Sequence, residues 1–198
     1  MSLKQSFAFF DFDYTLAKTT EAIRVFSPRG TRKDSDKNLY RTIYAPEYNN
    51  LSLANDESIT EASFVEFDDL NIKKTQPIRE VLFLYQVLHQ KCDNVYIVSA
   101  RPQKPENKIC QFLENKTGIP KKFHTYHGCE SSDPMKKSDF INKTLEGKMY
   151  DQIWLFDDSD KVIKHYVDLY SLDNRYNIIK ICHRNGLQLH FEAGCYNF

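Results

Sequence analysis

The sequence lacks several features that would assign it to common protein classes. Its 27 lysines and arginines balance 27 aspartates and glutamates, so no overall field draws it to nucleic acid or membrane. No apolar run is long enough to cross a bilayer, and the N-terminal residues MSLKQS show no signal-peptide pattern. No GxxxxGK[ST] loop is present, which argues against a P-loop kinase or ATPase. We therefore expect a soluble cytoplasmic protein.

Cysteine is scarce and scattered. The chain has five cysteines and no CxxC pair, which indicates reduced thiols rather than a disulfide framework. His124, His127 and Cys129 lie close enough in sequence to suggest a zinc site, but no convincing fourth ligand accompanies them. We favour the interpretation that they are ordinary loop residues.

The first apolar run, FAFFDFDYTL over residues 7–16, is the clearest feature that is present. An unbroken apolar run of this kind predicts a strand buried on both faces, as in a parallel sheet covered by helices. Asp11, Asp13 and Thr15 follow at its carboxyl end, where open α/β sheets bind their ligands. A strand end with two solvated acids and a turn is the alternative.

Two carboxylates at that position restrict the chemistry. Like charges about 4 Å apart repel by roughly 4 kcal/mol at an effective dielectric constant near 20, so Asp11 and Asp13 need a cation or a shared proton. Mg²⁺ is the expected cation, since it is held by one or two carboxylates together with substrate phosphate. Asp11 could then attack a phosphate ester, Asp13 could protonate the leaving oxygen, and the Thr15 hydroxyl could orient the phosphate.

Residues 18–75 lack sustained periodicity and are rich in turn formers. We interpret them as an insertion with its own small fold over the crevice, a cap or flap, in which 40–44 and 63–67 form strands or hairpin arms. The insertion also concentrates basic residues, which could grip a polyanionic substrate, although a solvated basic loop is the commoner explanation. These residues are Arg24, Arg29, Arg32, Lys33, Lys37 and Arg41.

From Pro77 onward, helical and strand patterns alternate. Helices are expected from Pro77, near Pro105, after Lys137 and over 162–170. Ser138 or Asp139 is the expected N-cap of the helix after Lys137. Buried strands are expected at 95–98, 153–156 and 178–182, with a brief one at 123–126 and a hairpin turn at Asn185-Gly186. This alternation predicts one α/β domain over 1–198: a Rossmann-like parallel sheet between two layers of helices.

Three of the expected strands end in reactive groups: Asp11 with Asp13, then Ser99, then Asp157 with Asp158. Because parallel strands end at the same edge, these groups should lie close together. Lys136 or Lys137 could supply a fourth polar group at this edge. The motifs DFDYTL, VYIVSAR, PMKKSDFI and WLFDDSD resemble, in this order, the four motifs of the haloacid dehalogenase superfamily of phosphohydrolases. The similarity covers residues 7–170 apart from the insertion.

This resemblance implies a Mg²⁺-dependent phosphomonoester hydrolase with an aspartyl-phosphate intermediate. It gives Asp11 as the nucleophile and Asp13 as the acid and base, with Thr15 and Ser99 holding phosphate oxygens. Lys137, preferred over Lys136, would neutralise the nucleophile. The implied metal ligands are Asp11, Asp13 through its carbonyl, and Asp158, with Asp157 beside it in a DD-type last motif.

Two departures bear on the substrate. Tyr14 stands where many members of the superfamily have glycine, so it could narrow the pocket or stack on a substrate ring. Arg101 resembles the arginine of the SGR and TGR motifs of polynucleotide 3′-phosphatase domains and related phage and viral proteins. It could bind a second phosphate or, equally, pair with an acid of the insertion. We list Arg101, Tyr14 and Ala100 as candidate substrate-binding residues.

These features favour a nucleotide or a phosphorylated nucleic-acid end as the substrate. A phosphatase of small metabolites or of phosphoproteins is the alternative, because fold resemblance cannot choose between substrates. A non-catalytic phosphate-binding or scaffold module is a third hypothesis. It predicts a damaged site, whereas Asp11, Asp13, Ser99 and Asp158 are all present.

Overall fold

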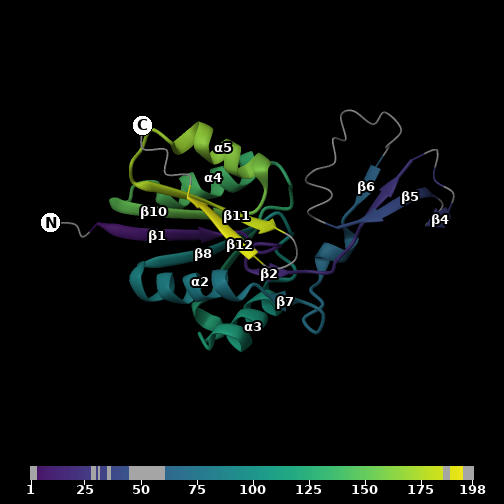
Figure 1. The fold of residues 1–198 in the computed structure, drawn as a ribbon, viewed down its shortest axis with the longest axis horizontal. Coiled ribbons are helices and arrows are strands. Elements are labelled where there is room, and N and C mark those ends of the chain that lie inside the picture. The colour runs from purple at the N-terminus through teal and green to yellow at the C-terminus, as the bar shows by residue number, and fades with distance from the viewer. Residues whose placement is uncertain are drawn as a thin grey trace.

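The computed structural model describes residues 4–27, 30, 32–34, 37–44, 61–184 and 188–193 (Figure 1). Its centre is a six-stranded sheet in the order β12-β11-β10-β1-β8-β9. Five strands are parallel, and only β12 runs antiparallel, against β11. The strands are β1 (Gln5–Phe10), β8 (Asn94–Ser99), β9 (Thr125–Gly128), β10 (Tyr150–Asp157), β11 (Tyr176–Arg184) and β12 (Gln188–Ala193).

Helices cover both faces of this sheet. Figure 1 shows α2 (Arg79–Lys91) and α3 (Glu106–Thr117) on one face and α4 (Pro134–Leu145) and α5 (Asp160–Tyr170) on the other. The predicted α/β class with a mostly parallel, Rossmann-like sheet is therefore confirmed. None of the helices in the described part of the chain is long and apolar enough to cross a membrane.

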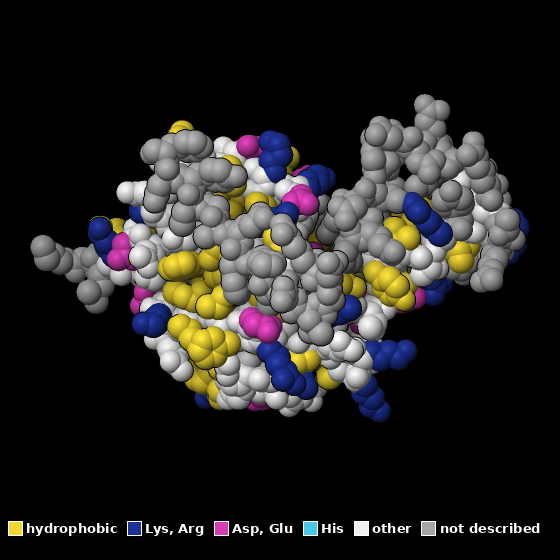
Figure 2. All heavy atoms as spheres, in the orientation of Figure 1, with side chains coloured by type: hydrophobic (Ala, Val, Ile, Leu, Met, Phe, Trp, Pro, Cys, Tyr) yellow, Lys and Arg dark blue, Asp and Glu magenta, His cyan; other side chains and the backbone are white. Residues whose placement is uncertain are grey.

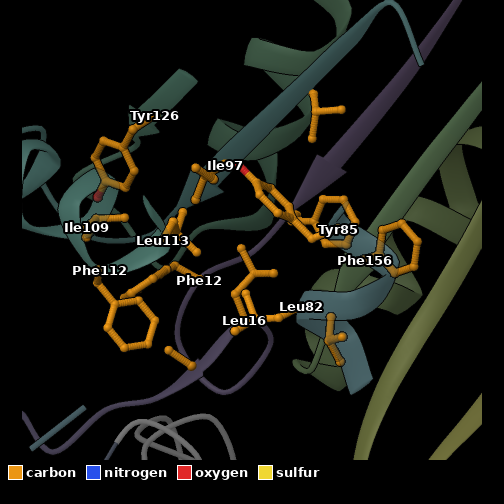
Figure 3. Close-up of a cluster of buried hydrophobic side chains, with 14 of the residues drawn as sticks. Phe12, Leu16, Leu82, Tyr85, Ile97, Ile109, Phe112, Leu113, Tyr126 and Phe156 are labelled. Atoms are coloured by element: carbon orange, nitrogen blue, oxygen red, sulfur yellow. The ribbon is translucent and has the colours of Figure 1, made fainter. Parts of the chain in front are cut away.

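The sequence of β1 explains its central place. Its side chains alternate between two buried clusters, because successive residues of a strand face opposite sides of the sheet. Ala8 and Phe10 pack toward α2 and α3, and Phe7 and Phe9 pack toward α4 and α5. Figure 3 shows part of the first cluster, with Phe12, Leu16, Leu82, Tyr85, Ile97, Ile109, Phe112, Leu113, Tyr126 and Phe156 labelled. The strand is thus fixed from both sides, which sets the position of the residues that follow it.

The insertion leaves and rejoins the domain through a short antiparallel pair, β2 (Ala17–Lys18) with β7 (Gln76–Pro77). Between them lies a separate four-stranded sheet in the order β4-β5-β3-β6, set to one side of the main sheet in Figure 1. Its strands are β3 (Ile23–Phe26), β4 (Arg32–Asp34), β5 (Lys37–Ile43) and β6 (Glu61–Ser63). A small core of Ile23, Val25, Ile43 and Phe67 holds it together.

Several predicted boundaries were wrong. The expected strand over 63–67 ends at Ser63, and a 3₁₀ turn, η2 (Val65–Asp68), follows and buries Phe67 in the core of the insertion. The expected strand over 123–126 begins at Thr125, after the 3₁₀ turn η3 (Lys121–Phe123).

Helix α4 also begins earlier than predicted. Its N-cap is Asp133, whose carboxylate accepts a hydrogen bond from the Met135 amide, and Pro134 is the first helical residue. Ser138 and Asp139 lie inside this helix, so neither is the cap. The predicted Asn185-Gly186 turn lies outside the described residues.

The surface reflects the balanced composition. Figure 2 shows basic and acidic side chains dispersed on one face of the molecule, with hydrophobic side chains gathered where α2 lies. No large basic field is visible on the described part of that face.

Candidate functional site

A cavity of about 690 Å³ lies at the carboxyl edge of β1, β8 and β10. The insertion supplies part of its wall through Ile23, Phe64 and Phe67, and the main domain supplies Asp11, Asp157 and Asp158. Its position is the one predicted, since the carboxyl ends of neighbouring parallel strands open into one crevice.

Lys137 joins two of the predicted strand-end acids. Its Nζ donates to Asp11 Oδ1 at 2.7 Å and to Asp157 Oδ2 at 2.6 Å, and all three side chains are buried. Asp157 is also anchored by the Ser159 amide, which donates to its Oδ1 at 2.9 Å. Lys136 is exposed because the next position along a helix points about 100° away, so Lys137 is the lysine of this site.

Asp158 adds a third carboxylate. Oxygen atoms of Asp11, Asp157 and Asp158 lie within 4.8 Å of one another, and this is the only such group of three or more metal-ligating side chains among the described residues. An all-oxygen donor set next to a cavity fits Mg²⁺, which keeps open positions for water and phosphate. The residues therefore fit the metal that the sequence predicts.

The charge balance of this cluster favours a further cation. Burial, opposed in part by Lys137 and reinforced by Asp157 and Asp13, raises the pKa of Asp11 to about 7. Burial together with the charges of Asp157 and Asp11 raises the pKa of Asp158 well above its ordinary value. Although burial acts in the opposite direction, Asp11 and Asp157 raise the pKa of Lys137, which keeps that lysine charged. When all three carboxylates are ionised, one ammonium group offsets only part of their charge, so a further cation or bound protons must balance the rest.

Asp13 has a different environment from Asp11. Arg101 donates to it with both ends of its fork, from Nε to Oδ2 and from Nη2 to Oδ1, each at 2.7 Å. The Thr19 hydroxyl donates to Oδ1 as well, at 2.6 Å. The Asp13 carboxylate is therefore not one of the clustered ligands, and metal binding through its carbonyl stays a prediction.

The hydrogen-bond donors of the Arg101 guanidinium are all engaged by groups of the protein itself. Besides Asp13, it donates to Glu21 Oε2 at 3.0 Å and to the carbonyls of Asp69 at 2.8 Å and Phe67 at 3.4 Å. A guanidinium has five N–H donors, and these contacts engage all of them. The side chain is 1% exposed and lies 4.6 Å from the centre of the Phe67 ring. Of the two predicted roles, the structure supports pairing with an acid of the insertion and not binding of a second phosphate.

The remaining predicted residues fall into two groups. Ala100 lines the cavity, whereas Tyr14, Thr15 and Ser99 are not part of its described lining. Ser99 is fully buried, and its hydroxyl accepts from the Arg101 amide at 3.2 Å. Thr15 is also buried, and its hydroxyl has no hydrogen-bond partner among the described residues. Phosphate contacts by Thr15 and Ser99 stay predictions.

Tyr14 occupies a left-handed backbone conformation, with φ of 58°. Glycine adopts this conformation without strain. This accounts for the glycine that many members of the haloacid dehalogenase superfamily have at this position of the motif. The Tyr14 hydroxyl donates to the Thr19 carbonyl at 3.2 Å, toward the start of the insertion. Burial, with Asp13 and Asp158 nearby, raises the pKa of Tyr14 to about 12. This geometry gives no support to stacking on a substrate ring.

The basic side chains of the insertion that the structure describes are not part of the described lining of the cavity. Arg24 pairs with Glu66 at 3.3 Å, and Lys37 lies 5.8 Å from the centre of the Phe26 ring. Lys33 and Arg41 are exposed. Arg29 and the side chain of Arg32 lie outside the described residues.

The weak zinc hypothesis finds no support. His124 is buried, with Nδ1 bonded to the Tyr85 hydroxyl at 2.8 Å and Nε2 to the Ile119 carbonyl at 3.0 Å. His127 stacks on Phe140 with ring centroids 3.9 Å apart. With Cys129, they form no metal-binding group among the described residues.

Sequence reasoning gave an acid of the insertion as one possible partner of Arg101 but did not identify Glu21, and it missed the pairing of Arg101 with Asp13. Thr19 and Glu21 begin the insertion, where no periodic pattern marks them, and the Phe67 and Asp69 carbonyls carry no side-chain signal. The only signal in the sequence that could have indicated Glu21 is its acidic side chain a few residues after the first motif.

Comparison of the chain with models of protein families, with curated proteins and with solved structures found no match. The geometry of the site is therefore what supports any function.

Proposed function

We propose that the protein is a Mg²⁺-dependent phosphomonoester hydrolase of the haloacid dehalogenase type. The observation that carries the proposal is Lys137 held between Asp11 and Asp157, with Asp158 beside them, at the strand-end edge of the sheet and facing a cavity. The order of the four sequence motifs supports the same assignment.

In this proposal, an Asp11 carboxylate oxygen attacks phosphorus while the bond from phosphorus to the leaving oxygen breaks. The leaving oxygen takes a proton from Asp13 and departs as an alcohol. Asp13 then accepts a proton from a water molecule that hydrolyses the aspartyl-phosphate, which releases inorganic phosphate and restores Asp11. Lys137 holds Asp11 in place and offsets the charge of the transferred group.

Magnesium held by Asp11 and Asp158 would supply the positive charge that the bound phosphate needs. It would also relieve the repulsion between these carboxylates without substrate, because one lysine offsets only part of their charge when they are ionised. Asp13 accepts two hydrogen bonds from Arg101 in this conformation, so it must leave that pairing before it carries a proton.

The scaffold hypothesis remains the second candidate, because Thr15 and Ser99 do not line the cavity in the described residues. A module of that kind would bind phosphate or metal without turnover. Its retained nucleophile, lysine and metal ligands make it the weaker proposal.

The test is release of phosphate from phenyl phosphate, with Mg²⁺ and with EDTA. We expect turnover only with Mg²⁺, and Asp11→Asn should lower kcat by at least about 1,000-fold, since the nucleophile is removed. Asp139→Asn, a matched change at an exposed position of α4, should retain activity. Equal turnover by Asp11→Asn and the unmodified protein would refute the nucleophile assignment. Absence of turnover alongside Mg²⁺-dependent phosphate binding would establish the scaffold function.

A further inference from the structure

The charges of the cavity restrict the substrate beyond its phosphate. Among the described lining residues, seven carry carboxylates and three carry basic groups. Every one of those basic groups already has an acidic partner: Lys137 has Asp11 and Asp157, Arg101 has Asp13 and Glu21, and Lys104 has Asp68 at 3.0 Å. The described lining therefore offers no uncommitted cation to a second phosphate.

The outer part of the lining is acidic. Glu130 and Asp133 are exposed there, and Asp68 lies on the side of the insertion. A substrate with a second phosphate would place that group among like charges, which costs affinity. A polynucleotide would meet the same acids, and none of the insertion's basic side chains that the structure describes lies in the lining beside them.

The insertion presents aromatic rings to the cavity. Phe67 is buried, with its ring against Arg101, and Phe64 packs edge-on to Phe67 at a centroid distance of 6.0 Å. Phe64 remains 38% exposed. Aromatic rings of this kind bind planar groups by stacking or edge contact. The volume of about 690 Å³ suits a small molecule bound between such rings and a few polar groups.

We infer that the substrate carries one phosphoryl group on a leaving group that is uncharged, planar and apolar on one face, and that Phe64 contacts that face. Aryl phosphates and nucleoside monophosphates have this chemistry, whereas nucleoside diphosphates and phosphorylated oligonucleotides do not. Phe64 is thus a specificity residue. The inference rests on the proposed function, and it narrows the substrate class that the sequence left open.

The first experiment compares kcat/KM for benzyl phosphate and cyclohexylmethyl phosphate, which are both esters of primary alcohols and differ mainly in the planarity of the ring, with glycerol phosphate as a substrate that has no ring. We expect a preference of about tenfold for benzyl over cyclohexylmethyl phosphate, a typical size for one aromatic contact. Phe64→Leu should bring the ratio near one, and turnover of glycerol phosphate by the same variant measures any general loss of activity. Phe123→Leu, at an exposed aromatic residue of η3 outside the cavity lining, is the matched control and should keep the preference.

The second experiment tests charge. A nucleoside monophosphate should be used at least about tenfold better than its diphosphate, and Glu130→Lys should narrow that difference, whereas Glu146→Lys, at the end of α4, should not. Turnover of all substrates with ratios near one, or ratios that Phe64→Leu and Glu130→Lys leave unchanged, would overturn the inference and leave the hydrolase proposal intact. Absence of turnover of every substrate would overturn both.

Discussion

Replacing Asp158 with asparagine should stabilise the metal-free protein and reduce its stabilisation by Mg²⁺. In the structure, Asp158 lies within 4.8 Å of Asp11 and Asp157, and Lys137 is the cation bonded to both of those acids. Each pair of like charges at that separation costs about 3.5 kcal/mol at an effective dielectric constant of 20. Lys137 offsets roughly one of the two repulsions, and relaxation and screening reduce the other. A gain of about 1–3 kcal/mol in unfolding free energy is therefore expected at pH 7 in EDTA.

The pH dependence gives this prediction a sign that can be checked. The pKa of Asp158 is raised in the folded state, so its carboxylate is protonated at low pH and the repulsion develops only as the pH rises. The stability advantage of Asp158→Asn should accordingly be smaller at pH 5 than at pH 7.5. Magnesium should act in the opposite direction, because binding at 100 times Kd adds about 2.7 kcal/mol to the unmodified protein and less to the variant.

Thermal unfolding in EDTA and in Mg²⁺ measures both effects. A difference of 1–3 kcal/mol corresponds to roughly 3–10 °C for a chain of this length. Asp139→Asn, which changes the same functional group at an exposed position, should shift Tm by less than about 2 °C in either condition. A destabilised Asp158→Asn variant in EDTA, or an undiminished shift by Mg²⁺, would refute the assignment of Asp158 to a shared metal site.

Three further predictions concern buried groups. Lys137→Met leaves two buried carboxylates without their cation and should lower the unfolding free energy by about 3–5 kcal/mol in urea titrations; a loss below 1 kcal/mol would contradict the pairing. Arg101→Lys keeps the charge but not the fork that holds Asp13, so kcat should fall by about tenfold or more while a pH–rate profile shows an altered limb; an unchanged profile would argue against this positioning role. Burial and the neighbouring His124 lower the pKa of His89 to about 4, so the unfolded chain takes up a proton first as the pH falls below 6.5. Partial exposure of His89 limits the resulting loss of unfolding free energy to about 1–2 kcal/mol between pH 7 and pH 5. In urea unfolding at these pH values, His89→Gln should reduce that loss, and an equal loss in the variant would contradict the prediction.

The main sheet could be predicted because its strands are unbroken apolar runs that alternate with amphipathic helices. Both faces of the sheet are covered along β1, β8, β10 and β11. Strands of this kind are continuous apolar runs, which can be recognised in the sequence without knowledge of the neighbouring strands. The convergence of Asp11, Asp157 and Asp158 followed from topology alone, because parallel strands end at one edge. Lys137 could be preferred over Lys136 from its spacing to an inward-facing residue of the same helix.

What could not be predicted depends on contacts between distant segments. The 3₁₀ turn η2 replaces an expected strand because Phe67 packs into the core of the insertion and under the Arg101 guanidinium. The start of α4 was misplaced although the Asp133-Pro134 pair is a recognised cap and first-turn combination. The partners of Arg101 include two backbone carbonyls. Every residue has a backbone carbonyl, so the sequence does not indicate which of them will accept a hydrogen bond.

The contacts of Arg101 also link the insertion to the chemistry of the site. One buried guanidinium bonds to Asp13, the proposed proton donor, and to Glu21 and the Asp69 carbonyl, which belong to the two ends of the insertion. Both carboxylate oxygens of Asp13 accept hydrogen bonds from this guanidinium, so Asp13 can take part in proton transfer only if those bonds rearrange. Freeing Asp13 therefore disturbs the bonds that hold both ends of the insertion. The position of the insertion and the release of Asp13 from Arg101 are thus coupled through one guanidinium, and a substrate that shifts one should shift the other.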